Sequence, residues 1–318
     1  MTNLHVKKPY PLLGIALVIA SVACFVVVDT TVKVISVSFS ILMAVWFRYL
    51  CQAVGMTLLI LPRWGSTRLT TRRPWAHFMR GALMLSSSAL SFVALAYMPV
   101  AELTAIWMLT PLMATFLSVV FLGERVNGLR WLLVAGGFLG AMLVIRPGGA
   151  DLDLSILLAL GGMLLYSVFL ILTGHMASTE DPMVMHMSSG WVGALMMSAA
   201  LPWIWQGIPS SDMGALLLLA GVAGTVGHYL LIVAYSHAPT GVIAPYMYLQ
   251  IAFALVAGWL IFDHMPGALE LAGMALIVVS GALAAWLAAR TDEPPTRTPQ
   301  RPTGGVPAPS TRPDPTAP

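Results

Sequence analysis

Charged residues are scarce in this chain, and cysteine is nearly absent. Only 9% of the 318 residues are Asp, Glu, Lys or Arg, whereas about a quarter of the residues in soluble domains are charged. Hydrophobic residues make up 58% of the sequence, and the mean hydropathy is +0.85. So few polar side chains cannot cover a globule in water, and the sequence therefore predicts an integral membrane protein.

Motifs that would indicate several other functions are also missing. The sequence has no G-x-x-x-x-G-K-[ST] phosphate loop, no H-x-x-x-H pair among its seven histidines and no G-x-S-x-G elbow. These absences argue against a nucleotide-driven motor, a zinc site and a serine hydrolase. A TVGYG-like filter, which would suggest a channel, is absent as well. We expect no metal, no cofactor and no enzymatic activity.

The two cysteines and the net charge of +3 exclude little more. Cys24 and Cys51 both lie inside apolar runs, so we expect buried thiols rather than a disulfide. The basic residues lie mainly beside the apolar runs, and we expect no nucleic-acid partner.

Long apolar runs fill most of the chain. A bilayer core requires about 20 apolar residues per helix, and ten runs fit this length: 11–31, 38–61, 76–98, 101–122, 129–146, 154–175, 183–206, 213–236, 240–262 and 267–290. The predicted fold is all-α, with ten transmembrane helices arranged as two inverted five-helix repeats. The first run follows two lysines, but it is too long for a cleaved signal peptide to be the favoured interpretation.

The basic residues beside these runs predict the orientation. With alternating spans, ten helices place both termini on one side, together with Lys7, Lys8, Arg63, Arg68, Arg72, Arg73, Arg125, Arg130 and four arginines in the C-terminal segment, namely Arg290 at the end of the last run and Arg297, Arg301 and Arg312 after it. The other side receives only Lys33 and Arg146, and Arg48 and Arg80 fall within spans. The positive-inside rule therefore predicts a multi-pass inner-membrane (plasma-membrane) protein with both termini in the cytoplasm.

The second half of the chain resembles the first. Residues 96–124 read "AYMPVAELTAIWMLTPLMATFLSVVFLGE" and residues 234–263 read "AYSHAPTGVIAPYMYLQIAFALVAGWLIFD". Both stretches open on Ala-Tyr, contain proline and end on an acid. Because each half holds an odd number of spans, a duplicated half must enter the membrane from the opposite side, as in many secondary transporters.

This duplication divides the chain into four segments. We expect a cytoplasmic N-terminus (1–10), a first repeat (11–149), a second repeat (150–290) and a cytoplasmic tail (291–318). The tail has nine prolines in 28 residues, and this composition is typical of disorder.

Residues 79–149 resemble the first EamA-type domain of the drug/metabolite transporter superfamily, and the second half resembles another such domain. The motif that carries the resemblance is the helix ending in "GER", followed by "GLRWLLVAGGFLGAMLVIRPG". The resemblance implies a ten-helix carrier with a central cavity. "VVDTTVKVI" and "WFRYLCQ" resemble the subgroup that contains S-adenosylmethionine and riboflavin uptake carriers. The second copy departs from the pattern, with Phe262-Asp263-His264 in place of Gly-Glu.

Charges inside the spans are the first candidates for the site, because each costs roughly 2.5–3.5 kcal/mol at the centre of a membrane helix. Arg48 lies near the middle of its span and should face the interior, either as a substrate contact or in a structural role. Asp29 and Lys33 are spaced i, i+4, so the preferred interpretation is a self-neutralising pair and the alternative is an outer gate. Glu102 suits either a helix start or ion coupling. Arg80 should snorkel to the cytoplasmic interface.

Aromatic and amide side chains in mid-span are the second group of candidates, because carrier sites combine apolar walls with a few convergent polar groups. The substrate-binding candidates besides Arg48 are Trp107, Tyr166, His228, Tyr246 and Gln250. Tyr246 and Gln250 should share one helical face. Pro111 and Pro245 should kink corresponding helices of the two halves beside the cavity, although they lie about one turn out of register.

The sequence therefore favours a secondary active transporter of a small organic metabolite that resembles an amino acid, vitamin or nucleoside. The expected partners are this substrate, the lipid bilayer and protons, and the chain is expected to be a monomer or homodimer. A membrane-embedded enzyme and a non-transporting scaffold are the alternatives. The enzyme lacks a visible nucleophile or metal cluster, and the scaffold would have no use for inverted symmetry.

Overall fold

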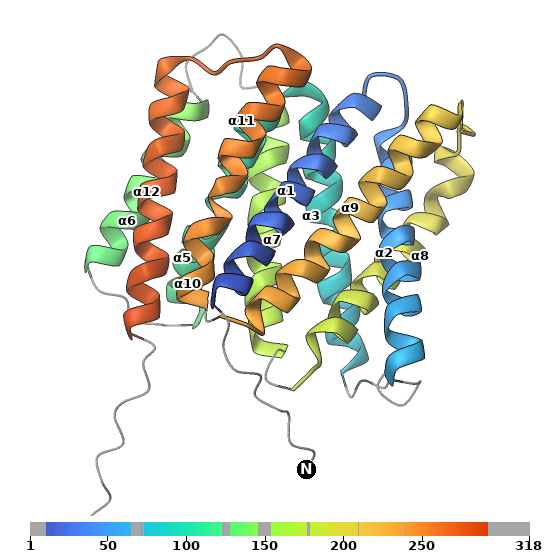
Figure 1. Cartoon of the computed structure of the whole chain (residues 1–318), viewed down its shortest axis with the longest axis horizontal. Helices are drawn as coiled ribbons and strands as arrows, with labels where there is room; N and C mark the ends of the chain where they lie inside the picture. The colour runs from blue at the N-terminus through green and yellow to red at the C-terminus, as the bar shows by residue number, and fades with distance from the viewer. Residues whose placement is uncertain are drawn as a thin grey trace, which may run out of the picture.

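The computed structural model describes residues 11–64, 71, 73–122, 128–145, 154–176, 179–208, 210–238 and 240–291 (Figure 1). Within these residues the chain forms α1 (Pro11–Ile35), α2 (Ile41–Trp64), α3 (Pro74–Tyr97), α4 (Val100–Trp107), α5 (Thr110–Leu122), α6 (Gly128–Ile145), α7 (Leu154–Met176), α8 (Pro182–Ile204), α9 (Ser211–Tyr235), α10 (Thr240–Met247), α11 (Leu249–Phe262) and α12 (Ala268–Thr291). The "GER" motif, the N-terminal segment and the Pro-rich tail lie outside the described residues.

The helices account for the ten expected spans. Nine stretches of the described residues are long and apolar enough to cross a membrane, and α6 is a tenth, shorter apolar helix. Two of the nine are broken in the middle, since α4 and α5 form one span and α10 and α11 form another. The expected ten-helix membrane architecture is confirmed.

Large apolar side chains cover the outside of the bundle. Phe121 is 78% exposed, and Leu58 and Leu260 are similarly uncovered. A soluble monomer does not show so much exposed apolar surface. The surface of the bundle is therefore suited to lipid.

The break between α4 and α5 follows directly from proline chemistry. Pro111 has no N–H to donate to the carbonyl of Trp107 four residues earlier. The hydroxyl of Thr110 donates to that carbonyl instead, which is how side chains satisfy a freed backbone group inside a membrane. The helix stops at Trp107 and restarts at Thr110, so the predicted kink at Pro111 is a complete interruption.

The second broken span is interrupted at a different distance from its proline. Pro245 lies inside α10, and the interruption comes three residues later at Tyr248, whose N–H donates to the Pro245 carbonyl at 3.3 Å. When the two halves are aligned on Glu124 and Asp263, Tyr248 corresponds to Leu109. The two prolines are out of register, but the two interruptions are in register.

Glycines bring helices of the two halves together. Gly140 on α6 faces Gly273 on α12 so closely that a Cβ on either would lie 2.5–2.7 Å from the other's carbonyl oxygen. Gly221 and Gly227 similarly seat α9 against Cys51 of α2 and Phe25 of α1. These glycines allow the helices to approach one another closely.

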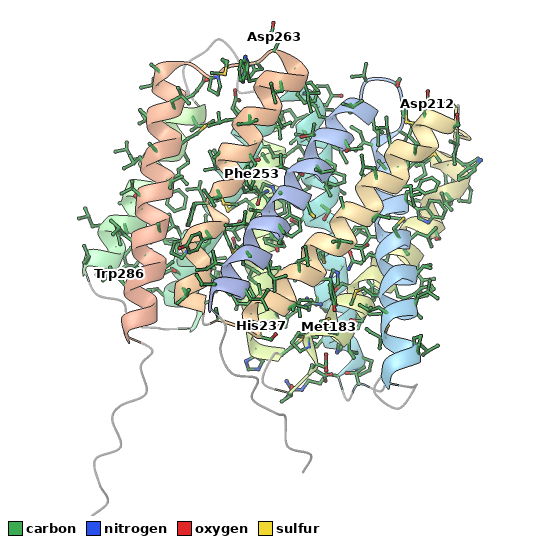
Figure 2. The ribbon with its side chains drawn as sticks, viewed as in Figure 1. Met183, Asp212, His237, Phe253, Asp263 and Trp286 are labelled. Atoms are coloured by element: carbon green, nitrogen blue, oxygen red, sulfur yellow. The ribbon has the colours of Figure 1, made fainter. Side chains whose placement is uncertain are left out.

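The two halves are intertwined rather than side by side. α1 packs along α9, and the corresponding pair, α3 and α7, packs in the same way; α2 contacts α8, and α6 contacts α12 (Figure 1). We call the end where α1 begins and α9 and α12 finish the N-terminal end of the bundle. In Figure 2 His237 and Met183 lie at this end, while Asp263 and Asp212 lie at the opposite end.

Candidate functional site

A cavity of about 380 Å³ lies between the two halves. Its walls come from α1 to α5 of the first half and from α7 and α9 to α12 of the second, and they are mostly apolar. It extends from Asp29 and Leu103 towards Tyr235 and Ala285 near the N-terminal end. This size and character suit a small organic molecule.

Arg48 reaches this cavity, as the sequence predicted for its interior position. The residue is 5% exposed, and its Nη2 donates to Ser88 Oγ at 2.8 Å. The same Ser88 oxygen lies 3.0 Å from the hydroxyl of Tyr49. The guanidinium carbon is 4.2 Å from the centre of the Tyr49 ring and 5.5 Å from that of Phe92. These contacts fix the head group at the cavity wall while its Nε remains buried without a partner.

Asp29 and Lys33 do not form the predicted self-neutralising pair. Lys33 Nζ instead donates to the carbonyls of Ala96 and Met98, both at 3.1 Å. Unpaired carbonyls at the end of a helix attract a cation, and α3 ends at Tyr97. Asp29, one helical turn before Lys33 on α1, lines the cavity. The i, i+4 spacing allowed an ion pair between Asp29 and Lys33, but backbone carbonyls from a distant part of the chain bind the lysine instead.

Trp107 forms part of an aromatic wall at the first helix break. Its indole Nε1 donates to Ser91 Oγ at 2.9 Å, and its ring centre lies 4.8 Å from that of Tyr166. Tyr166 in turn stacks on Phe169, with ring centres 5.1 Å apart. Trp107 and Tyr166 both line the cavity, so the structure brings these two candidates together.

The second break places Tyr248 and Gln250 at the cavity. Both are largely buried and both line it, whereas Tyr246 is 37% exposed and does not. The predicted shared face of Tyr246 and Gln250 is therefore wrong. That prediction assumed a continuous helix, and the interruption at Tyr248 changes the helical phase between the two residues. The ring of Tyr248 fits directly against Gly281 of α12.

His228 also lines the cavity and belongs to a pair of histidines. Its ring centre lies 5.0 Å from that of His186 and 4.7 Å from that of Phe25. His186 is fully enclosed and contacts Gln52 Nε2 through its ring Nδ1 at 3.2 Å and its carbonyl at 2.9 Å. Among the described residues, no group of three His, Cys, Asp or Glu could hold a metal ion.

The opposite end of the bundle is closed above the cavity. There α4 packs against α11, and α1 packs against α3 and α4. Glu102, in the first turn of α4, lies with its Oε1 3.9 Å from Nε2 of His264, just after α11. Glu102 and Lys33 therefore contribute to the closed end and do not line the main cavity.

The structure contradicts the prediction that Arg80 snorkels to the cytoplasmic interface. Arg80 is 6% exposed rather than extended to the interface. Its Nε donates to Thr173 Oγ1 at 2.8 Å, and its Nη1 donates to Ser189 Oγ at 2.7 Å and to the Met185 carbonyl. The guanidinium also lies over the Phe169 ring. Snorkelling does not occur because α7 and α8 supply a full set of acceptors.

A ten-helix membrane protein with an internal cavity shared by two similar halves defines a polytopic solute carrier. The profile of the EamA-like transporter family matches residues 12–146 and 153–286. The chain belongs to this family and is a membrane transporter of small molecules, as the sequence resemblance implied.

Characterised relatives span most of the chain. It is 29% identical over 230 residues to a riboflavin transporter from Rhizobium johnstonii, covering 70% of this chain and 74% of that one. It is 26% identical over 233 residues to an S-adenosylmethionine uptake transporter from Rickettsia conorii, covering 73% and 79%. It is also 26% identical over 281 residues to a pseudopaline exporter from Pseudomonas aeruginosa, covering 84% and 94%.

A solved crystal structure has the same fold. It superposes with a TM-score of 0.61 and 17% sequence identity, covering 89% of this chain and 100% of the other. At this identity the similarity concerns the fold alone.

Sequence reasoning missed three groups of the cavity. Tyr248 was not among the candidate site residues, although it clusters with two of them, Tyr246 and Gln250, in the "YMYLQ" stretch. Ser88 and Ser91 were not among the candidates either, yet both line the cavity and position Arg48 and Trp107. Tyr248 lies three residues after Pro245, at the interruption of its span, so its distance from the proline is the signal that would have found it.

Proposed function

We propose that the protein carries a small organic metabolite across the inner membrane by alternating access, with both termini in the cytoplasm and without catalysing a reaction. The observation that supports this most is the central cavity, to which both halves contribute a helix broken at the same aligned position. Inverted repeats that meet at such breaks are the usual construction of secondary transporters.

The asymmetry between the two ends supports a conformation open towards the cytoplasm. At the opposite end, α4 packs on α11. The duplication relates this pair to α10 and α5, which have no comparable packing among the described residues. In the alternate conformation the two pairs would exchange roles, so α5 and α10 would close the N-terminal end while Lys33 leaves the carbonyls of Ala96 and Met98.

Flux into proteoliposomes tests transport itself. Riboflavin and S-adenosylmethionine are the first labelled solutes to use, because relatives of this chain carry these names. Uptake and release should each exceed those of protein-free vesicles, and a pH gradient should change the rate if protons are the coupling ion. Absence of flux for a broad panel of metabolites, in both directions and with or without the gradient, would contradict the carrier.

Thiol labelling tests alternating access. In a chain whose Cys24 and Cys51 are replaced by serine, an impermeant thiol reagent on the cytoplasmic side should modify Ala285→Cys, which lines the cavity at the N-terminal end. Leu103→Cys, at the closed end of the cavity, should react from the other side only when transported solute is present. Labelling of both positions from the outside without solute would refute the proposed conformation.

A further inference from the structure

Asp29 presents a carboxylate to the cavity without a protein partner. Its side chain lines the cavity, and none of the described residues forms a hydrogen bond or an ion pair with it. Lys33, one turn away, is bound to backbone carbonyls instead. An ionisable group inside a membrane protein is expensive to place there and usually marks a functional position. Asp29 is thus available to a ligand rather than to the fold.

Arg48 presents the opposite charge to the same cavity, and its guanidinium is only partly satisfied. A guanidinium has five N–H donors. In the structure Nη2 donates to Ser88, and the buried Nε has no acceptor. Tyr49 and Phe92 hold the group in place through their rings. A fixed guanidinium with free donors matches the two oxygens of a carboxylate or phosphate.

The two charges face the same cavity but remain separate. Asp29 and Arg48 both line it, yet no ion pair joins them among the described residues. A ligand with only a positive charge would leave Arg48 unpaired in an apolar cavity, and a ligand with only a negative charge would leave Asp29 unpaired. An uncompensated charge in such surroundings is costly. A ligand with both charges satisfies both residues at once.

The remaining wall determines the body of the ligand. Trp107 is held by Ser91 and packs against Tyr166, and these rings form an apolar surface of fixed shape. Such a surface favours a flat, weakly polar body. Building on the transport function proposed above, we propose that the cavity binds zwitterionic metabolites. The cationic group lies on Asp29, the anionic group on Arg48 and a planar body against Trp107 and Tyr166.

A matched series of benzene derivatives tests this assignment by binding to the purified full-length protein. 3-(Aminomethyl)benzoate and 4-(aminomethyl)benzoate are zwitterions that differ in charge spacing. 4-Ethylbenzoate carries only the negative charge, and 4-isopropylbenzylamine carries only the positive one. Equilibrium dialysis should show at least one zwitterion binding about tenfold or more tightly than both singly charged compounds.

Two conservative variants should change this ranking in opposite directions. Asp29→Asn should weaken zwitterion binding by about 10-fold to 100-fold, as expected for loss of a charged hydrogen bond, and the anion should become the preferred compound. Arg48→Gln should make the cation the preferred compound. The matched controls are Asp212→Asn and Arg73→Gln, whose side chains are exposed and do not line the cavity. Both should keep the wild-type ranking.

The remaining outcomes are also decisive. Equal binding of all compounds, no binding of either zwitterion to the wild-type protein, or an unchanged ranking in Asp29→Asn protein that elutes as a folded monodisperse species would each overturn the inference. Flux of a singly charged or neutral solute with no preference for zwitterions would overturn it while retaining the carrier. Zwitterion binding without flux of any solute would retain the site and overturn the proposed transport function.

Discussion

Ser88 is the residue on which the position of Arg48 depends, and its removal gives a sharp test of the site. Its hydroxyl accepts from Arg48 Nη2 at 2.8 Å and lies 3.0 Å from the Tyr49 hydroxyl. Ser88→Ala removes the hydroxyl that accepts from the guanidinium and also contacts the Tyr49 phenol. Tyr49 is fully buried, so water cannot replace the lost contact there.

The size of the effect follows from these contacts. Hydrogen bonds between membrane helices contribute about 0.6 kcal/mol on average and up to about 1.7 kcal/mol, and bonds to charged groups are the stronger ones. The loss of these two bonds should lower the free energy of unfolding by roughly 1–3 kcal/mol, or about 5-fold to 150-fold in the folding equilibrium. The guanidinium should also become mobile, so apparent affinity for a carried solute should fall.

Reversible unfolding of the purified protein in mixed micelles, followed by circular dichroism, measures the first effect, and initial rates of flux measure the second. Ser86→Ala is the matched control, because this serine lies on the same helix, is exposed and does not line the cavity. If Ser88→Ala and Ser86→Ala unfold at the same denaturant concentration and transport with the same apparent affinity, the proposed support of Arg48 by Ser88 is wrong.

Two further predictions concern residues behind the cavity wall. Arg80→Met should lower the free energy of unfolding by about 2 kcal/mol in the same assay, because three interhelical hydrogen bonds are lost. The control Arg73→Met, at an exposed position, should change the free energy of unfolding by less than about 0.5 kcal/mol. Equal stabilities of the two variants would mean that Arg80 snorkels after all. Gly281→Ala should displace the Tyr248 ring, which occupies the space of the new Cβ, and lower apparent solute affinity severalfold at a cost of about 1–3 kcal/mol in stability. Gly174→Ala, where a Cβ would contact nothing, should leave affinity unchanged, and an unchanged affinity in Gly281→Ala protein would disprove the packing argument.

Hydropathy and proline chemistry were sufficient to predict the architecture. Each apolar run must cross the bilayer as a helix because an exposed backbone cannot be satisfied in lipid, so the ten spans follow from run length alone. The inward position of Arg48 follows from its distance to either interface. The break after Trp107 follows from the missing N–H of Pro111.

The errors arose where a side chain binds a partner that is distant in sequence. Lys33 binds carbonyls 63 and 65 residues away, and Arg80 binds groups 93–109 residues away. Local spacing identifies which neighbours a residue can reach, but it cannot weigh them against acceptors that only the assembled bundle provides. The error at Tyr246 has another cause, because a single interrupted turn after Pro245 rotates every later residue relative to the earlier ones.

The contact between Lys33 and the end of α3 has a consequence for how the family varies. Its acceptors are the backbone carbonyls of Ala96 and Met98, and any residue at these two positions supplies the same oxygen. Mutational drift at 96 and 98 therefore leaves the contact intact, while replacement of Lys33 removes it. Among homologues this closure would appear as constraint at a single position without a covarying partner, so comparisons based on correlated substitutions would overlook it.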